Sequence, residues 1–148
     1  MNHFLVNVFN EILRTEEASL KTGAYKNLSV REMHVIEAVC FAQKNHSNTA
    51  SEIANSQNVT AGTLTTTIGT LERKGFVFRR HDQRDRRVVR IFPTEKGKNA
   101  NEIHQQFHHE MVSSIMSALS EEETLVFVKG LGAVQRFFET KPKMNGGT

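Results

Sequence analysis

The chain has 148 residues, 38% of them hydrophobic and 24% charged, with a formal net charge of +3. This length predicts one domain with a hydrophobic core of its own, and no apolar run approaches the roughly 18 residues that a membrane span needs. The amino end, MNHFLVNVFNEIL, lacks the basic start and the small-residue cleavage site of a secretory signal. The single cysteine excludes an internal disulfide and is typical of a protein in the reducing cytoplasm, where we place this one.

Two helices are predicted before the middle of the chain. Residues 3–20 form the first, because apolar side chains recur along one side of it. Ser29 and Glu32 have the spacing of a capping box, in which each side chain bonds the other residue's backbone N–H, and this box opens the second helix. The core face of the second helix comprises Met33, Ile36, Val39 and Cys40. Cys40 is expected to be a small buried hydrophobe rather than a redox sensor.

The rest of the chain is organised around residues 49–92. They predict a short helix, a turn at residues 57–59, a second helix, and then a two-stranded hairpin. Thr49 or Ser51 is available as the N-cap of the first of these helices, and Thr60 caps the second. Gly75 is placed to end the second helix in a left-handed conformation. The core-facing stripe of the second helix comprises Leu64, Ile68 and Leu71. The predicted fold class is mostly α with a small β-wing (α+β). Residues 49–92 have the layout of a winged helix-turn-helix, which holds one helix in the major groove of DNA and a β-ribbon beside it.

The outward face of the second of these helices carries an unusual set of residues. Between Thr60 and Thr70 there are six threonines and two glycines, although each Thr costs roughly 0.5 kcal/mol and each Gly about 1 kcal/mol of helix stability relative to Ala. A tolerated polar face is one interpretation. Contact with DNA is the other, because hydroxyls bond phosphates and base edges while Gly allows close approach of the backbone. The residues predicted to touch DNA here are Gly62, Thr63, Thr65, Thr66, Thr70 and Arg73.

The predicted hairpin, with strands at residues 76–78 and 88–92, concentrates positive charge. Between Arg79 and Arg90 there are six arginines and two aspartates, a net charge of +4 in a chain whose total is +3. Arginine on a ribbon is suited to a narrow minor groove. Asp85 and Arg87, two apart on a strand, would share a face, so Asp85 is expected to hold Arg87 in position.

Two long helices are expected after the hairpin, ending near Leu119 and Glu139. Ser120 and Glu123 form a second capping box between them. The last helix is apolar around most of its circumference, so one face of core cannot bury it. We therefore expect a homodimer built from residues 1–28 and 95–140, with residues 29–93 as the DNA-binding region and residues 141–148 as a flexible tail.

The order of these elements and several motifs resemble the MarR family of dimeric bacterial transcription regulators. The motifs are LERKGFVFRR, DQRDRRVVRI and PTEKG, and the likeness covers nearly the whole chain. The resemblance implies double-stranded DNA with an inverted-repeat operator as the partner, with Arg87 entering the minor groove and Arg84 and Arg86 near phosphates. Phe92-Pro93-Thr94 departs from the usual Leu-Thr and affects how the wing joins the long helix.

A narrower resemblance is to the members of this family that repress fatty-acid synthesis genes. It rests on SVREMHVIEAV, LERKGFVFRR and FHHEMVSSIMSALSEEETLVFVKGL. This likeness implies a repressor without a cofactor, whose operator binding is strengthened by long-chain acyl-acyl carrier protein. The acyl chain would enter an apolar cavity, and the candidate lining residues are Met33, Phe107 and Met111, although such a stripe also fits plain core.

Three other functions are compatible with parts of the sequence. His104 and His108 lie one helical turn apart, a spacing at which two imidazoles share a metal, so a zinc-responsive repressor of the same family is the alternative. A hydrolase could use His104 or His108 with Glu110, but the sequence contains no nucleophile motif to support one. We therefore expect no enzyme activity. An architectural DNA protein would spread its positive charge over the surface rather than confine it to the hairpin.

Overall fold

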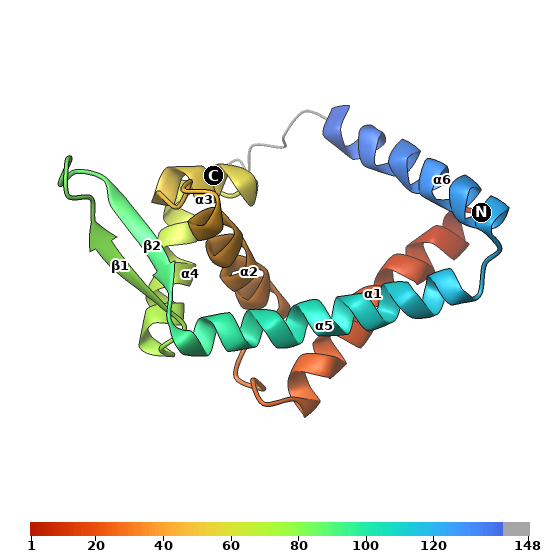
Figure 1. Ribbon diagram of the computed structural model, residues 1–148, viewed down its shortest axis with the longest axis horizontal. Helices are drawn as coiled ribbons and strands as arrows, with labels where there is room; N and C mark the ends of the chain where they lie inside the picture. Colours follow the sequence, from red (N-terminus) through yellow and green to blue (C-terminus); the bar gives the residue numbers. More distant parts are fainter. Residues whose placement is uncertain (141–148) are drawn as a thin grey trace. The chain divides into compact units, whose positions relative to one another are not determined.

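The computed structural model describes residues 1–140, and the predicted flexible tail, residues 141–148, lies outside the described residues. Helices predominate and two strands form the wing, which confirms the predicted fold class (Figure 1). The elements are α1 (Asn2–Thr22), α2 (Val30–Lys44), α3 (Ala50–Ser56), α4 (Ala61–Arg73), β1 (Val77–His81), β2 (Val89–Pro93), α5 (Glu95–Ser117) and α6 (Glu121–Thr140). The chain divides within α5 into two compact units, residues 1–105 and the residues from 106 onward.

Side-chain caps fix where the helices of the DNA-binding region begin. The Ser29–Glu32 box opens α2 as predicted, with Glu32 accepting from the Ser29 N–H at 2.8 Å. Thr49, rather than Ser51, caps α3, and it forms a capping box with Glu52 that the sequence reading missed. Thr60 caps α4 as predicted. Asn58, with a positive φ of 52°, makes the turn between α3 and α4.

The core of the first unit lies between α2, α3, α4 and the base of the wing. Phe76, Ile53 and Leu71 are fully buried there, and the inward positions of α4 are those predicted. Met33 is also fully buried in this cluster. Its side chain is enclosed by core neighbours, and its candidate role in lining an effector cavity stays a prediction.

The wing is an antiparallel pair in which Val77 lies opposite Pro93 and His81 lies opposite Val89. Gly75, with a φ of +79°, ends α4 in the left-handed conformation that the sequence predicts. The strands run further toward His81 and Pro93 than predicted, and Pro93 is tolerated because β2 is an edge strand of a two-stranded sheet.

The joint between wing and α5 depends on Thr94 and Gly97. The Thr94 hydroxyl donates to the Gly75 carbonyl at 2.7 Å and accepts from the Gly97 N–H at 3.1 Å, so it caps α5. A Cβ at Gly97 would lie 2.2 Å from the carbonyl oxygen of Phe76. The unusual Phe92-Pro93-Thr94 sequence is therefore compatible with a tightly fitted joint.

The terminal helices leave much apolar surface uncovered in the single chain. In the first unit, Phe4 of α1 is 69% exposed and Leu13 is 54% exposed. In the second unit, the predicted Ser120–Glu123 capping box opens α6, which has no buried residue, and its Leu125 is 73% exposed. No helix among the described residues is long and apolar enough to cross a membrane.

Candidate nucleic-acid interface

The predicted contact residues of α4 lie on its outer surface. Gly62, Thr65, Thr66 and Arg73 are exposed, while Thr63 and Thr70 are half-buried. Their hydroxyl hydrogens are already engaged. Thr65 donates to the Ala61 carbonyl at 2.8 Å, Thr66 donates to the Gly62 carbonyl at 3.1 Å, and Thr70 donates to the Thr66 carbonyl at 3.3 Å. Without DNA, this face therefore offers oxygen lone pairs and methyl groups, and the predicted contacts with phosphates and base edges stay a prediction.

Arg79 of β1 lies against α4 and has a structural role. Its guanidinium donates to the Thr65 carbonyl at 3.1 Å and lies 3.5 Å from a Glu72 carboxylate oxygen. A Cβ on Gly69 would come within 3.6 Å of the same guanidinium. Gly69, which the sequence reading assigned to the DNA-facing side, therefore lies beside Arg79, where α4 meets the wing.

A polar network that the sequence did not predict joins the loop end of the wing to Asn48, just before α3. Arg90 donates to Asp82 at 2.6 Å and to the amide oxygen of Asn48 at 3.1 Å. Asn48 is 4% exposed and donates from its amide nitrogen to the Ile91 carbonyl at 2.9 Å. The Arg90 hydrogen bond, with those from the backbone N–H groups of Arg84 and Asp85, lowers the pKa of Asp82 to about 2. Asp82 therefore stays ionised at neutral pH and fixes both the loop and Arg90.

Arg80 is held in a different way, by two aromatic rings. Its guanidinium carbon lies 5.7 Å from the ring centroid of Phe78 and 5.8 Å from that of Phe92. The two rings stack with centroids 5.5 Å apart. This cation–π arrangement covers apolar side chains on the wing surface. Arg79, Arg80 and Arg90 thus serve the structure of the wing.

The other three arginines of the hairpin, Arg84, Arg86 and Arg87, lie exposed in the loop between β1 and β2. The predicted contact of Asp85 with Arg87 is present, since Arg87 Nε and Nη2 donate to the Asp85 carboxylate at 3.1 Å and 3.3 Å. The reason given for it was wrong, because both residues lie in the loop rather than on a strand. Hydrogen bonds from Arg87 lower the pKa of Asp85.

Among the described residues of the first unit, a buried carboxylate meets two histidines. Glu16 Oε1 lies 2.7 Å from His34 Nε2 and 3.4 Å from His104 Nε2, and Glu16 and His104 are 3% and 4% exposed. The sequence reading proposed His104 with His108, its neighbour one turn along α5, and did not identify Glu16. The only signal for Glu16 in the sequence is that a carboxylate, which is costly to bury, lies on an otherwise apolar face of the first helix.

Two further predictions concern thiol chemistry and the effector. Cys40 is buried, and burial raises its pKa to about 11, which fits the predicted buried hydrophobe and disfavours a redox sensor. Phe107 and Met111, in the second unit, are half-buried.

Comparison with known proteins agrees with this geometry. A model of the MarR family matches residues 38–89. The structure of Streptococcus pneumoniae FabT in complex with DNA is similar, with 37% sequence identity and a TM-score of 0.86, covering 93% of this chain and 94% of that chain. The Staphylococcus aureus MepR–DNA complex, at 21% identity and a TM-score of 0.76 over 93% of this chain and 96% of that one, shares the fold.

A curated relative is the HTH-type transcriptional repressor YetL of Bacillus subtilis (strain 168). It is 39% identical over 92 residues, which are 62% of this chain and 55% of that repressor, so the match spans little more than half of YetL. The likeness to FabT extends over 93% of this chain, and the family model spans α4 and the loop of the wing. The chain therefore belongs to the MarR family of winged helix-turn-helix transcription regulators.

Proposed function

We propose that this regulator represses fatty-acid synthesis genes as a homodimer, and that long-chain acyl-acyl carrier protein strengthens its binding to an inverted-repeat operator. The observation that carries the proposal is the likeness to FabT, at 37% identity over 93% of this chain. The exposed arginines of the wing loop and the open face of α4 are the surfaces that would meet the duplex.

The proposed dimer would cover the apolar surface of the terminal helices. Phe4 of α1 is 69% exposed, and Val126 and Phe138 of α6 are 72% and 61% exposed. Exposed apolar surface on this scale is typical of subunit interfaces. Light scattering after size exclusion is expected to give twice the chain mass of 16.8 kDa. A monomer at micromolar concentration would contradict the proposed assembly.

The effector is tested on the operator itself. Anisotropy of a labelled fragment from the protein's own promoter is measured with long-chain acyl carrier protein, with the same carrier lacking its acyl chain, and with neither. We expect the acylated carrier alone to lower the apparent Kd. An equal effect of both carrier forms, or no effect, would refute the proposed effector. Phe107→Ala and Met111→Ala then test whether these half-buried residues contact the acyl chain.

A metal-responsive repressor is the second candidate, favoured by the buried cluster in the first unit. Nitrogen and oxygen ligand atoms from Glu16, His34 and His104 lie within 4.8 Å of one another. A carboxylate and two imidazoles form a donor set that suits Zn²⁺. Equilibrium dialysis with Zn²⁺, using wild type and His34→Ala, tests this function. One tightly bound Zn²⁺ per chain that the variant loses, with operator binding sensitive to chelators, would favour it over the acyl effector.

A further inference from the structure

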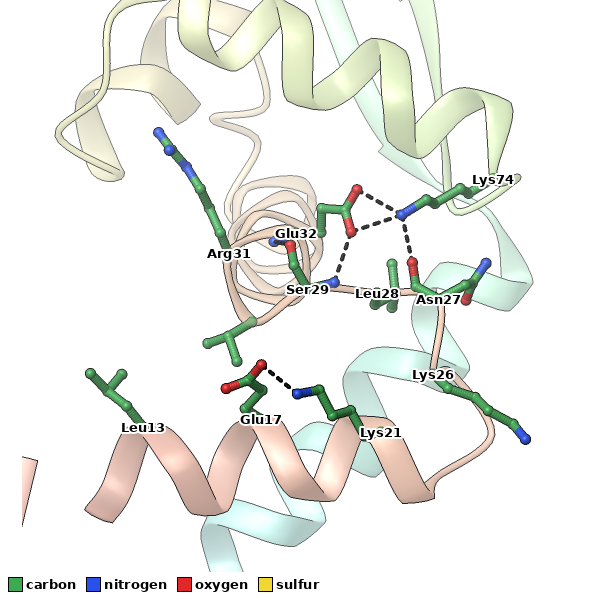
Figure 2. Close-up of a pocket in the computed structure, with 11 residues that line it drawn as sticks. Leu13, Glu17, Lys21, Lys26, Asn27, Leu28, Ser29, Arg31, Glu32 and Lys74 are labelled. Carbon is green, nitrogen blue, oxygen red and sulfur yellow. Dashed lines mark hydrogen bonds and ion pairs between the residues drawn. The ribbon is translucent and has the colours of Figure 1, made fainter. Parts of the chain in front are cut away.

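A solvent-open groove of about 630 Å³ lies in the first unit, beside the end of the reading helix α4. In Figure 2 one wall is α1, which contributes Leu13, Glu17 and Lys21, and the other is the start of α2 with the connector before it. Lys74, the residue that follows α4, reaches in from the far side. Leu13, Leu28 and Val30 supply the apolar part of the lining.

Cations outnumber acids on this lining by four to two. Lys21 is paired with Glu17 at 2.8 Å, and Lys74 is paired with Glu32 at 2.8 Å. Within the described part of the chain, Lys26 and Arg31 have no ion-pair partner, and in Figure 2 they lie on opposite sides of the groove. Two exposed positive charges therefore flank an apolar hollow, an arrangement complementary to an acidic surface.

The Lys74–Glu32 pair connects this groove to α4. Lys74 Nζ lies 2.8 Å and 2.9 Å from the two oxygens of Glu32, and it also donates to the Asn27 carbonyl. Glu32 at the same time accepts from the Ser29 N–H and so completes the cap of α2. Burial acts to raise the pKa of Glu32, but the hydrogen bonds from Lys74 and Ser29 outweigh it and lower the pKa, so the link is ionic at neutral pH.

Position in the fold separates this groove from the DNA-facing turn. Most of the predicted α4 contacts with DNA lie in the first half of that helix. Arg73, the last of them, is exposed, whereas Lys74 turns toward Glu32 and the Asn27 carbonyl. A 13-residue helix is about 20 Å long. A partner seated at Lys74 would therefore leave the first turns of α4 open to the major groove, and both could bind together.

We infer that the groove between α1 and the start of α2 docks the acidic surface of acyl carrier protein, with Lys26 and Arg31 as its contact cations and the Lys74–Glu32 pair as its link to the reading helix. This inference rests on the proposed function, which names that partner. Carrier proteins are small and strongly acidic, so the unpaired cations favour them by charge complementarity. In this inference, docking of the carrier favours the state in which Lys74 and Glu32 are paired, and that state binds the operator more tightly. The coupling is reciprocal, so the operator must increase the affinity for the carrier by the same factor by which the carrier increases the affinity for the operator.

The docking surface is tested with the double variant Lys26→Ala/Arg31→Ala. The matched control is Arg14→Ala/Lys44→Ala, which removes the same charge from α1 and α2 at exposed positions outside the groove. Fluorescently labelled acyl carrier protein is titrated with each full-length protein, and operator affinity is measured with and without it. We expect the Kd for the carrier to rise at least tenfold in the groove variant only, and operator affinity without carrier to be unchanged.

Each outcome decides a separate question. Failure of wild type to bind the carrier at all would overturn the docking site. If wild type binds the carrier but its operator affinity does not rise, the proposed function is refuted. The docking site is then decided by comparing the carrier affinities of the groove variant and the control. Equal carrier affinities for the groove variant and the control would overturn the site even if the effector is correct.

The link is tested separately with Lys74→Met and Lys74→Arg. Methionine keeps the side-chain length but loses the ion pair with Glu32, whereas arginine keeps a charge there. We expect Lys74→Met to bind carrier within about threefold of wild type but to lose most of the carrier-induced gain in operator affinity, and Lys74→Arg to recover it. A full gain in Lys74→Met would overturn the link.

Discussion

The six arginines of the wing differ in what holds them, and this difference can be measured. Four are held by protein groups: Arg79 by α4, Arg80 by two rings, Arg90 by Asp82, and Arg87, within the loop, by Asp85. The guanidinium groups of Arg84 and Arg86, exposed in the loop, have no bonding partner within the described residues. We therefore expect Arg84→Ala/Arg86→Ala to remove phosphate contacts without altering the fold of the wing.

The expected magnitude follows from counterion release. Each arginine that neutralises a phosphate contributes about 0.9 to the slope of log K against log salt. Two such residues per chain, and two chains in the proposed dimer, would make the slope shallower by roughly 3.6. Between 50 and 200 mM salt, wild type would then lose roughly 150-fold more affinity than the variant does. Anisotropy of a labelled operator across this salt range measures both slopes.

Two controls give this experiment its meaning. Arg14→Ala/Lys44→Ala removes the same charge at exposed positions far along the chain from the wing and is expected to keep the wild-type slope. Arg80→Ala removes a guanidinium that rests on the rings of Phe78 and Phe92, and its slope should also stay close to wild type. A wild-type slope in the loop variant, or a slope change in Arg80→Ala as large as that in the loop variant, would refute the division of the arginines.

Other predictions concern stability and reactivity. Gly97→Ala should cost about 1–3 kcal/mol and lower Tm by several degrees, because its methyl would lie 2.2 Å from the Phe76 carbonyl; an unchanged melt would show that the joint yields. Thr49→Ala should cost about 1 kcal/mol in urea unfolding through loss of the α3 cap, and Thr49→Ser should recover most of it. Cys40, with a pKa of about 11, should resist iodoacetamide at pH 8 and react on unfolding; rapid native labelling would contradict its burial. The pKa of Asp82 is lower in the folded protein than its ordinary value of 3.8, so its contribution to stability is complete above pH 3.8 and is lost as the pH falls toward 2. Unfolding measured as a function of pH should show this loss in wild type and not in Asp82→Asn.

Much of the fold follows from patterns within one or two helical turns. The Ser29–Glu32, Thr60 and Ser120–Glu123 caps and the left-handed Gly75 were predicted correctly, because each requires only the residue types present and their local spacing. The stripe of α4 was also correct, since three apolar positions define its buried face. Helix caps and buried helix faces can therefore be predicted from a single sequence.

The candidate sites were less predictable, because they depend on contacts between distant segments. Glu16 meets His34 and His104 only after three helices pack together, and the sequence around Glu16 does not identify which residues it will meet. Met33 was a candidate for the effector cavity because it is apolar, yet the same property places it in the core. Periodicity identifies a buried face, but it does not distinguish packing from a ligand cavity.

The same contacts suggest where regulation has to act. Arg79 ties β1 to α4 through Thr65 and Glu72, and Thr94 ties the end of β2 to Gly75 directly after α4. These contacts join α4 to the wing along the helix and again directly after it. A signal that separated the helix from the wing would have to break several hydrogen bonds at once. The half-buried Lys74–Glu32 pair joins the residue after α4 to the start of α2. Because these bonds tie α4 to the wing, an effector that acts at the Lys74–Glu32 pair would have to move the helix and the wing together.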